Sequence, residues 1–374
     1  MNRVHLKEIT ELRHRLHAWP ELSLEEHRTK EALMDFINTH TRLEVVDRGH
    51  WFYAVFHCGK PDAAAPLAFR ADFDALPIVE NGTFPYVSGN PGVSHKCGHD
   101  GHSAALAGLA LTVDESGCDR DIYFIFQHAE EIGAGGEECA RLIPEKGIAR
   151  IFAFHNMSRI PEGSVMVRDG ITQCASKGLT IGFTGTPAHA SQPEDGRNPS
   201  RAIAELVLYT GEAAEPGDYE DLVMATVVQV MTGNKNFGIA AFSGEVSMTL
   251  RACYEQDMKK LEKSIRQYAG ELAHRDGLEL SFVESDVFPE TVNDSVCAEL
   301  VRLAARKNGS PVIPMDSPFR ASEDFGYYLK QCPGAIFYIG NGEDYPELHT
   351  SGYDFNDRIL ETAVELFRRI IELA

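Results

Sequence analysis

The chain has 374 residues, of which 43% are hydrophobic and 24% are charged, a composition typical of a globular protein. Its 35 basic and 56 acidic side chains give a formal net charge of −21 at pH 7, which disfavours binding to nucleic-acid phosphates or to anionic lipid surfaces. Because this length exceeds what one compact core usually fills, two domains are expected.

The amino-terminal segment and the cysteines predict a cytoplasmic protein. Residues 1–15 are charged and lack the apolar core of a signal peptide. No stretch reaches the ~20 consecutive apolar residues that a membrane-spanning helix needs. The eight cysteines are scattered and form no Cys-x-x-Cys pair, so most are expected to be buried free thiols.

The first part of the chain alternates between helices and strands. Apolar residues at helical spacing predict a helical region over residues 9–37, interrupted at Trp19-Pro20. The elements expected next are strands 51–57 and 67–71, helix 103–113, strand 122–127, helix 136–143 and strand 151–155. This alternation favours an α/β domain with a mostly parallel sheet.

The pattern changes after Gly178. The expected elements are strand 179–184, helix 199–209, strands 223–230 and 244–252, helix 256–274 and strand 278–283. The order β-α-β-β-α-β is that of a split ferredoxin-like unit. Helix 296–308, strand 335–339 and helix 357–373 return to the α/β pattern. We therefore predict an α/β domain of residues 1–178 and 291–374, interrupted by an α+β domain of residues 179–290.

Residues 95–102, His-Lys-Cys-Gly-His-Asp-Gly-His, combine three histidines, one cysteine and one aspartate. The glycines allow tight turns, so these side chains can converge from one loop. Thiolate and imidazole are good ligands for zinc-like ions. The alternative is a polar loop with a structural cysteine, but so many ligand-type side chains at this spacing favour a metal site.

Two adjacent glutamates, Glu130 and Glu131, follow the strand expected at 122–127, where open α/β sheets place their sites. Neighbouring side chains point apart, so one carboxylate can bind a metal while the other faces a reacting water. Two solvated glutamates at a helix start are the alternative. His155, at a predicted strand end, and His349, in a predicted loop, are not identified as ligands by spacing alone.

Six segments in this order resemble the M20 metallopeptidase family, in particular its amidohydrolase branch, which includes hydrolases of hippurate, auxin conjugates and N-acyl amino acids. The segments are 15–21 (Arg-Leu-His-Ala-Trp-Pro-Glu), 70–77 (Arg-Ala-Asp-Phe-Asp-Ala-Leu-Pro), 95–102, 130–131, 189–193 (His-Ala-Ser-Gln-Pro) and 322–325 (Ser-Glu-Asp-Phe). The resemblance runs from about residue 13 to about residue 357. It implies a zinc-exopeptidase-like catalytic domain and a dimerising lid formed by the insertion.

The resemblance also implies a two-metal site. Its ligands would be Cys97, His99, Glu131, His155 and His349, with Cys97 bridging two divalent ions, zinc or manganese, and cobalt as a further candidate. Glu130 would be the general base.

Other branches of the family have His-x-Asp where this chain has Arg70-Ala71-Asp72. Arg70 cannot bind a metal, so the resemblance gives that role to His99. Asp72 is then expected to orient a ligand or to cap the strand.

The reaction implied is hydrolysis of a small amide, such as an N-acyl amino acid. Glu130 would take a proton from a metal-activated water that attacks the carbonyl carbon, and would pass it to the leaving nitrogen. The resemblance further implies that Asn236 and Arg251 contact substrate, Arg251 through a carboxylate. His189 would reach the neighbouring site of a homodimer.

Three alternatives remain at this stage. A dipeptidase or aminopeptidase would need a site for a free α-amino group, and no residue in the sequence identifies one. A non-catalytic binding protein would be expected to lose a ligand or Glu130, and none is lost. A structural zinc domain usually has closely spaced ligand pairs, whereas His155 and His349 are far apart in the chain. The chain departs from the family at His128 and after Asn236, so the acyl pocket is not defined by the resemblance.

Overall fold

The computed structural model describes residues 3–215, 217 and 219–374, which form two compact units. The first contains the chain up to Thr172, together with Thr291–Ser317 and Asp324–Ala374. The second contains Gln173–Glu290 and Pro318–Glu323. None of the helices in the described ranges combines the length and apolar content needed to cross a bilayer.

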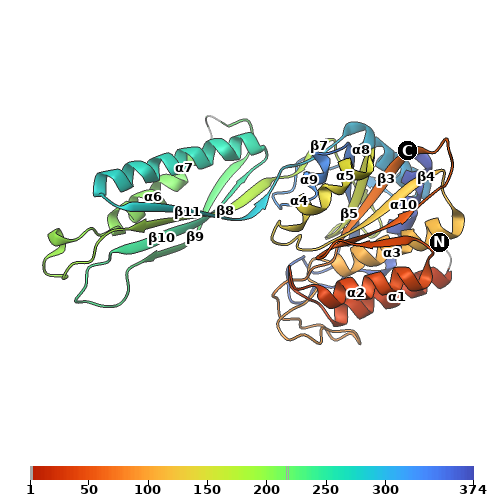
Figure 1. The fold of residues 1–374 in the computed structure, drawn as a ribbon, viewed down its shortest axis with the longest axis horizontal. Coiled ribbons are helices and arrows are strands. Elements are labelled where there is room, and N and C mark those ends of the chain that lie inside the picture. Colours follow the sequence, from red (N-terminus) through yellow and green to blue (C-terminus); the bar gives the residue numbers. More distant parts are fainter. Residues whose placement is uncertain (1–2, 216, 218) are drawn as a thin grey trace. The chain divides into compact units, whose positions relative to one another are not determined.

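An eight-stranded sheet forms the centre of the first unit (Figure 1). In sheet order, its strands are β1 (Glu44–Asp47), β2 (Phe52–Phe56), β4 (Arg120–Gln127), β3 (Ala64–Asp72), β5 (Arg150–Ser158), β14 (Gly334–Gly342), β6 (Val165–Met166) and β13 (Val312–Ile313). The neighbouring strands β4, β3, β5 and β14 are parallel, so their carboxyl ends lie at one edge. The predicted α/β class is confirmed.

Both faces of this sheet are buried, because alternate side chains of a strand point to opposite faces. Phe69 of β3 lies in one core, whereas its neighbour Ala68 lies in the other. Helices over the first core are α1 (Arg3–Ala18), α2 (His27–His40), α3 (His99–Ser116), α8 (Ser295–Asn308) and α10 (Leu360–Leu373). Helices over the second are α4 (Gly135–Ala140), α5 (Leu142–Lys146) and α9 (Gly326–Leu329).

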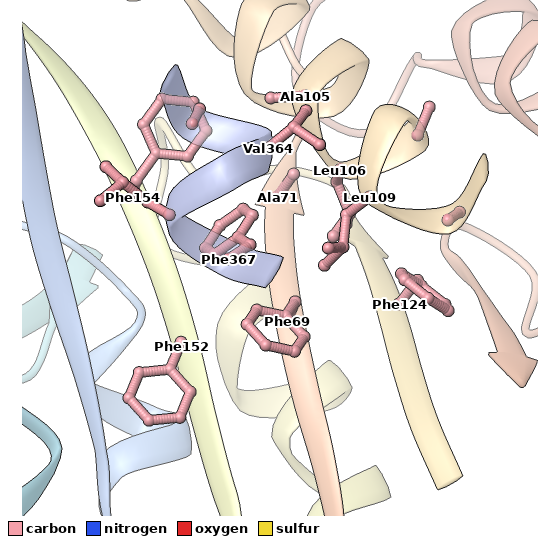
Figure 2. Close-up of a cluster of buried hydrophobic side chains, with 14 of the residues drawn as sticks. Phe69, Ala71, Ala105, Leu106, Leu109, Phe124, Phe152, Phe154, Val364 and Phe367 are labelled. Atoms are coloured by element: carbon pink, nitrogen blue, oxygen red, sulfur yellow. The ribbon is translucent and has the colours of Figure 1, made fainter. Parts of the chain in front are cut away.

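Aromatic side chains fill the first core. Figure 2 shows Phe367 of α10 beside Phe69 of β3, with Phe152 and Phe154 of β5 nearby. The rings of Phe69 and Phe367 meet edge to face, with centroids 4.9 Å apart. Leu106 and Leu109 of α3 pack into the same cluster. This packing fixes α3, which carries part of the candidate site, against the strands that carry the rest.

The second unit has one four-stranded antiparallel sheet, in the order β11 (Glu279–Phe288), β8 (Ala175–Thr184), β10 (Ser243–Ala252), β9 (Val223–Thr232). Helices α6 (Ser200–Ala213) and α7 (Glu255–Asp276) pack along it and bury one apolar core between them and the sheet (Figure 1). The order β8-α6-β9-β10-α7-β11 is the ferredoxin-like arrangement that the sequence predicts.

The structure differs from the sequence-based expectations in three places. The helix expected at 136–143 is divided into α4 and α5 at Arg141, because Pro144 has no N–H to continue the hydrogen bonding of α4. The second unit begins at Gln173 rather than at residue 179, since β8 starts at Ala175. It also includes Pro318–Glu323, which the backbone of Cys174 holds through hydrogen bonds to the carbonyls of Phe319 and Ala321.

Several short elements lack a sequence signal. The elements are β1, β6, β13, α9, the paired strands β7 (Gly170–Gln173) and β12 (Thr291–Asn293), and the 3-10 turn η1 (Pro193–Asp195), whereas the 3-10 turn η2 (Asp357–Ile359) forms the start of the helix expected at 357–373. Segments this short carry too few residues for a periodic pattern.

Candidate metal centre

The five predicted ligands come together at the carboxyl edge of the first unit's sheet. Cys97 lies two residues before His99, the first residue of α3, Glu131 follows β4, His155 lies in β5, and His349 lies in the loop after β14. Four are buried or nearly so, whereas the His349 side chain is 53% exposed. The centre is therefore reachable from solvent on the side of His349.

Gly98 makes this convergence possible. Its φ of +101° lies in the region that side chains other than glycine rarely adopt, and a Cβ there would lie 2.2 Å from Asn156 Oδ1. The sharp turn at Gly98 separates Cys97 in the loop from His99 in the first turn of α3. The expectation that residues 95–102 form one loop is therefore wrong for residues 99–102, which are helical.

The donor atoms form two groups that share the thiol of Cys97. Its Sγ lies 3.3 Å from His155 Nε2 and 3.3 Å from His349 Nε2. Glu131 Oε1 lies 3.7 Å from both His99 Nε2 and His349 Nε2. Within each group, Cys97 with His99 and His155, or Cys97 with Glu131 and His349, the donor atoms lie within 4.8 Å of one another. This is a suitable arrangement for two ions bridged by one sulfur.

Glu130 lies beside both groups. Its Oε2 is 3.9 Å from His99 Nε2, and it can group with His99 and Glu131. Glu130 as a whole is 6% exposed, so its carboxylate lies in the buried part of the centre.

Hydrogen bonds on the far side of two imidazoles leave their Nε2 atoms available. His99 Nδ1 lies 3.0 Å from Asp74 Oδ1, and His155 Nδ1 lies 2.7 Å from the carbonyl oxygen of Asn156. Because these acceptors require a proton on Nδ1, the neutral rings have a lone pair on Nε2, directed at the centre. Metal-binding histidines are usually held by such partners.

Two buried atoms at the centre have no hydrogen-bond partner, His99 Nε2 and Glu131 Oε1. An unsatisfied buried polar atom destabilises a protein by roughly 1–3 kcal/mol. Both atoms belong to the ligand sets above, so a bound cation would satisfy them. This observation supports the fit of the site to a metal.

The electrostatics also favour a cation. Burial raises the pKa of the Cys97 thiol, and the carboxylates of Glu131 and Glu130 raise it further. Burial raises the pKa of Glu131 to about 7. Burial opposes protonation of His99, but the carboxylates of Asp72 and Asp74 outweigh it and raise its pKa to about 10. A divalent ion would compensate this negative potential and favour the thiolate.

The turn that carries the glutamates is held by two carboxylates from other segments. Ala129 has φ +49°, an unusual value for a residue with a side chain. Its N–H donates to Glu26 Oε1 at 2.8 Å, and the N–H of Glu131 donates to Asp74 Oδ2 at 2.9 Å. These bonds fix the directions of Glu130 and Glu131.

Asp72 forms its hydrogen bond with His102, not with the predicted ligand His99. Its Oδ1 lies 2.6 Å from His102 Nδ1, and 3.9 Å from His99 Nδ1. The guanidinium of Arg70 donates to Asp72 Oδ2 at 2.5 Å and to Asp324 Oδ1 at 2.8 Å. Arg70 is therefore the buried countercharge of two aspartates, and Asp74 is the carboxylate that orients His99.

The three predicted substrate residues lie in the second unit. His189 and Asn236 are exposed and lie in adjoining loops, joined by a bridge between His189 and Ile239. Arg251 is opposite Ser176 in the sheet, and its Nη1 donates to Ser322 Oγ at 2.7 Å and to the carbonyl of Arg320 at 2.8 Å. His189 follows the far end of β8, so the structure does not bring it near Arg251 within one chain.

Sequence reasoning missed several residues that support the centre. Asp74 was visible as the second acid of Asp72-Phe73-Asp74, but no local pattern connects it to His99 and Glu131. Glu26 accepts from the backbone N–H of Ala129 with its carboxylate, and Asn156 accepts from His155 with its main-chain carbonyl. Each bond has a main-chain atom on one side, so the residue types alone do not reveal the pair.

Comparison with known proteins extends over nearly the whole chain. The pattern of the peptidase family M20/M25/M40 matches residues 68–373. An N-acetylcysteine deacetylase from Bacillus subtilis (strain 168) is 26% identical over 366 residues, which cover 96% of this chain and 94% of that protein. An N-acetyldiaminopimelate deacetylase from Shouchella clausii (strain KSM-K16) is 28% identical over 369 residues, 96% of each chain.

A solved structure has the same fold. The Bacillus subtilis YXEP protein, a dinuclear metal binding peptidase from the M20 family, superposes with a TM-score of 0.82 at 23% identity and covers 100% of both chains.

We expect Asp74→Asn to weaken zinc binding by ~10–100-fold, because the amide cannot serve both the ring of His99 and the N–H of Glu131. The measurement is zinc bound per chain against free zinc concentration. Asp121→Asn is the matched control, since Asp121 also accepts from a histidine and a backbone N–H, of His57 and Cys58, away from the centre. Equal effects of the two changes would contradict the role of Asp74.

Proposed function

Because this chain belongs to the peptidase family M20/M25/M40, we propose that it is a metal-dependent amidohydrolase that cleaves N-acyl amino acids or similar small amide conjugates. The observation that carries this proposal is the pair of donor groups that share the thiol of Cys97. The related N-acetylcysteine and N-acetyldiaminopimelate deacetylases support the class of substrate.

The proposed cofactor is two divalent ions, held by Cys97, His99 and His155 on one side and by Cys97, Glu131 and His349 on the other. Sulfur and nitrogen donors favour zinc, and manganese and cobalt are the other candidates. When bound, such ions supply Lewis acidity to the attacking water and to the carbonyl oxygen of the substrate.

Glu130 is the proposed general base. It is held by the turn that Glu26 and Asp74 fix, and it lies next to the donor groups without being needed in either. Its carboxylate would take a proton from the attacking water and deliver it to the leaving amide nitrogen. The proton is thus returned within one reaction, and no covalent intermediate with the enzyme is required.

Arg251 is the proposed contact for the carboxylate of an N-acyl amino acid. Ser322 and the carbonyl of Arg320 take two hydrogen bonds from Nη1, which fixes the guanidinium while it stays half-buried. Asn236, exposed in its loop, is the proposed second contact.

We also propose a homodimer formed through the second unit. Strand β9 is an edge strand, and Val228, Val230 and Met231 on it are 63%, 47% and 50% exposed. Leu208 on α6 is 70% exposed. Long apolar edge strands of this kind tend to pair with another chain.

In the proposed dimer, His189 could contact a substrate bound to the partner subunit, whereas it lies too far from Arg251 of its own chain to share a substrate with it. Arg251 is opposite Ser176, and His189 lies beyond Thr184 at the other end of β8. At ~3.3 Å per residue, the eight steps from Ser176 to Thr184 span ~26 Å, too far for both side chains to contact one small substrate. We therefore assign His189 to the active site of the partner subunit.

All eight cysteines are free thiols, which supports a cytoplasmic location.

Purified enzyme should hydrolyse N-acyl amino acids and lose this activity on chelation, with recovery on addition of zinc, manganese or cobalt. The screen includes N-acetyl and longer N-acyl amino acids together with unblocked dipeptides. Preference for unblocked dipeptides would indicate a peptidase instead, and full activity without bound metal would overturn the proposal.

Glu130→Gln and Glu131→Gln should separate catalysis from metal binding. The first keeps two metals per chain but loses the proton acceptor, so kcat should fall by ~10²–10⁴-fold or more. The second removes a ligand and should lower metal content. Metal analysis and steady-state kinetics of both variants are the measurements, and the reverse pattern would exchange the two roles.

Mixed dimers should reveal whether His189 acts on the partner subunit. If it does, a dimer of Glu130→Gln with His189→Ala has one doubly damaged site and one intact site. Random pairing makes about half of the dimers mixed, so activity should recover to about a quarter of wild type after the two variants are refolded together. Differential tags verify that subunits have exchanged. No recovery despite exchange would place His189 in its own chain's site or outside catalysis.

A further inference from the structure

Lys96, the residue before Cys97, is a fully buried cation. Its Nζ donates to the carboxylate of Glu80, whose side chain is 3% exposed, and to the carbonyl oxygen of Tyr353 at 2.6 Å. Burying an ammonium group is unfavourable unless it is paired and hydrogen-bonded. The lysine therefore has a defined place, in the segment that carries one ligand and against the segment that carries another.

The main chain of Lys96 makes a second connection between these segments. The N–H of His349 donates to the carbonyl oxygen of Lys96 at 2.7 Å. His349 has φ +60°, an uncommon conformation that persists only when the surroundings impose it. Four residues further on, the carbonyl of Tyr353 receives the Lys96 ammonium. Residues 349–353 are thus held at both ends by the same lysine.

We propose that Lys96 is a positioning residue that fixes the distance between Cys97 and His349, and through it the metal group of Cys97, Glu131 and His349. His349 needs this support because it is the exposed member of the ligand set and lies in a loop. The other group depends on His99 and His155, which are fixed by Asp74 and by the carbonyl of Asn156. The inference rests on the proposed metal-dependent function.

Glu80 makes the anchor rigid. Besides Lys96, it binds His17 Nε2 at 3.0 Å and accepts from the N–H of Ser88 at 2.6 Å. Even with burial opposing it, the hydrogen bonds from His17 and Lys96 lower the pKa of Glu80 to about 2. Removing the Lys96 charge leaves Glu80 with His17 and Ser88, so Lys96→Met is a cleaner change than Glu80→Gln, which would strand a buried ammonium.

The experiment measures zinc bound per full-length chain across a series of buffered free zinc concentrations, which resolves a tight and a weaker binding event. We expect Lys96→Met to raise the half-saturation concentration of one event by ~10–100-fold and to change the other by less than about threefold. Lys307→Met, at an exposed position of α8, is the matched control and should change neither.

His349→Ala should weaken the same single event. Adding Lys96→Met to His349→Ala should then have no further effect, because the lysine acts through that histidine. Equal weakening of both events by Lys96→Met, or its full effect in the His349→Ala background, would overturn the proposal. If Lys96→Met does not fold, as judged by circular dichroism, Lys96→Gln replaces it and the same outcomes apply. Absence of zinc binding by the wild-type chain would instead refute the proposed function.

Discussion

Burial of negative charge at one edge of the sheet is the constraint on which the rest of the centre depends. Glu130, Glu131, Asp72 and Asp74 gather there with the thiol of Cys97. Burial, with repulsion from neighbouring carboxylates as the smaller cause, raises the pKa values of the thiol and of Glu131. Arg70 neutralises part of this charge by binding Asp72 and Asp324. The remaining negative charge is uncompensated and lies beside the two buried atoms that lack a hydrogen-bond partner. Divalent cations bound there would neutralise it.

The fold supports this arrangement with unstrained elements and concentrates strain in a few residues. The parallel strands bring their carboxyl ends together, and α3 is fixed against them by the apolar core. The unusual backbone conformations of Ala129 and His349 occur next to Glu130, the proposed general base, and at a proposed metal ligand. Both are held by hydrogen bonds from distant segments, through Glu26 and Lys96. Directions of the reactive side chains are therefore set by tertiary contacts.

The sequence predicts the chemistry better than the geometry, as particular residues show. Residues 95–102 and the Glu130-Glu131 pair stand out because rare ligand types are adjacent in the chain. His155 and His349 look ordinary alone, and only the family resemblance includes them. The supports could not be predicted: Asp74, rather than Asp72, orients His99, because the turn after β3 decides which carboxylate reaches the ring. Lys96 lies within a polar segment and has no feature in the sequence that marks it as buried, yet it is fully buried.

Periodicity predicts the α/β class and the ferredoxin-like insertion, and the adjacent residues at 95–102 and 130–131 predict a metal site. The amide-hydrolase chemistry, and His155 and His349 as ligands, follow from the family resemblance of the sequence. The tertiary structure adds that the donor atoms of each group, with Cys97 common to both, lie within 4.8 Å of one another, that residues 99–102 are helical, and that Pro318–Glu323 belongs to the second unit. The physical reason is that these features depend on contacts between residues up to about 250 positions apart, such as Cys97 with His349. The type of a residue limits the groups that its side chain can bind, and the fold determines which of these groups lie in contact with it.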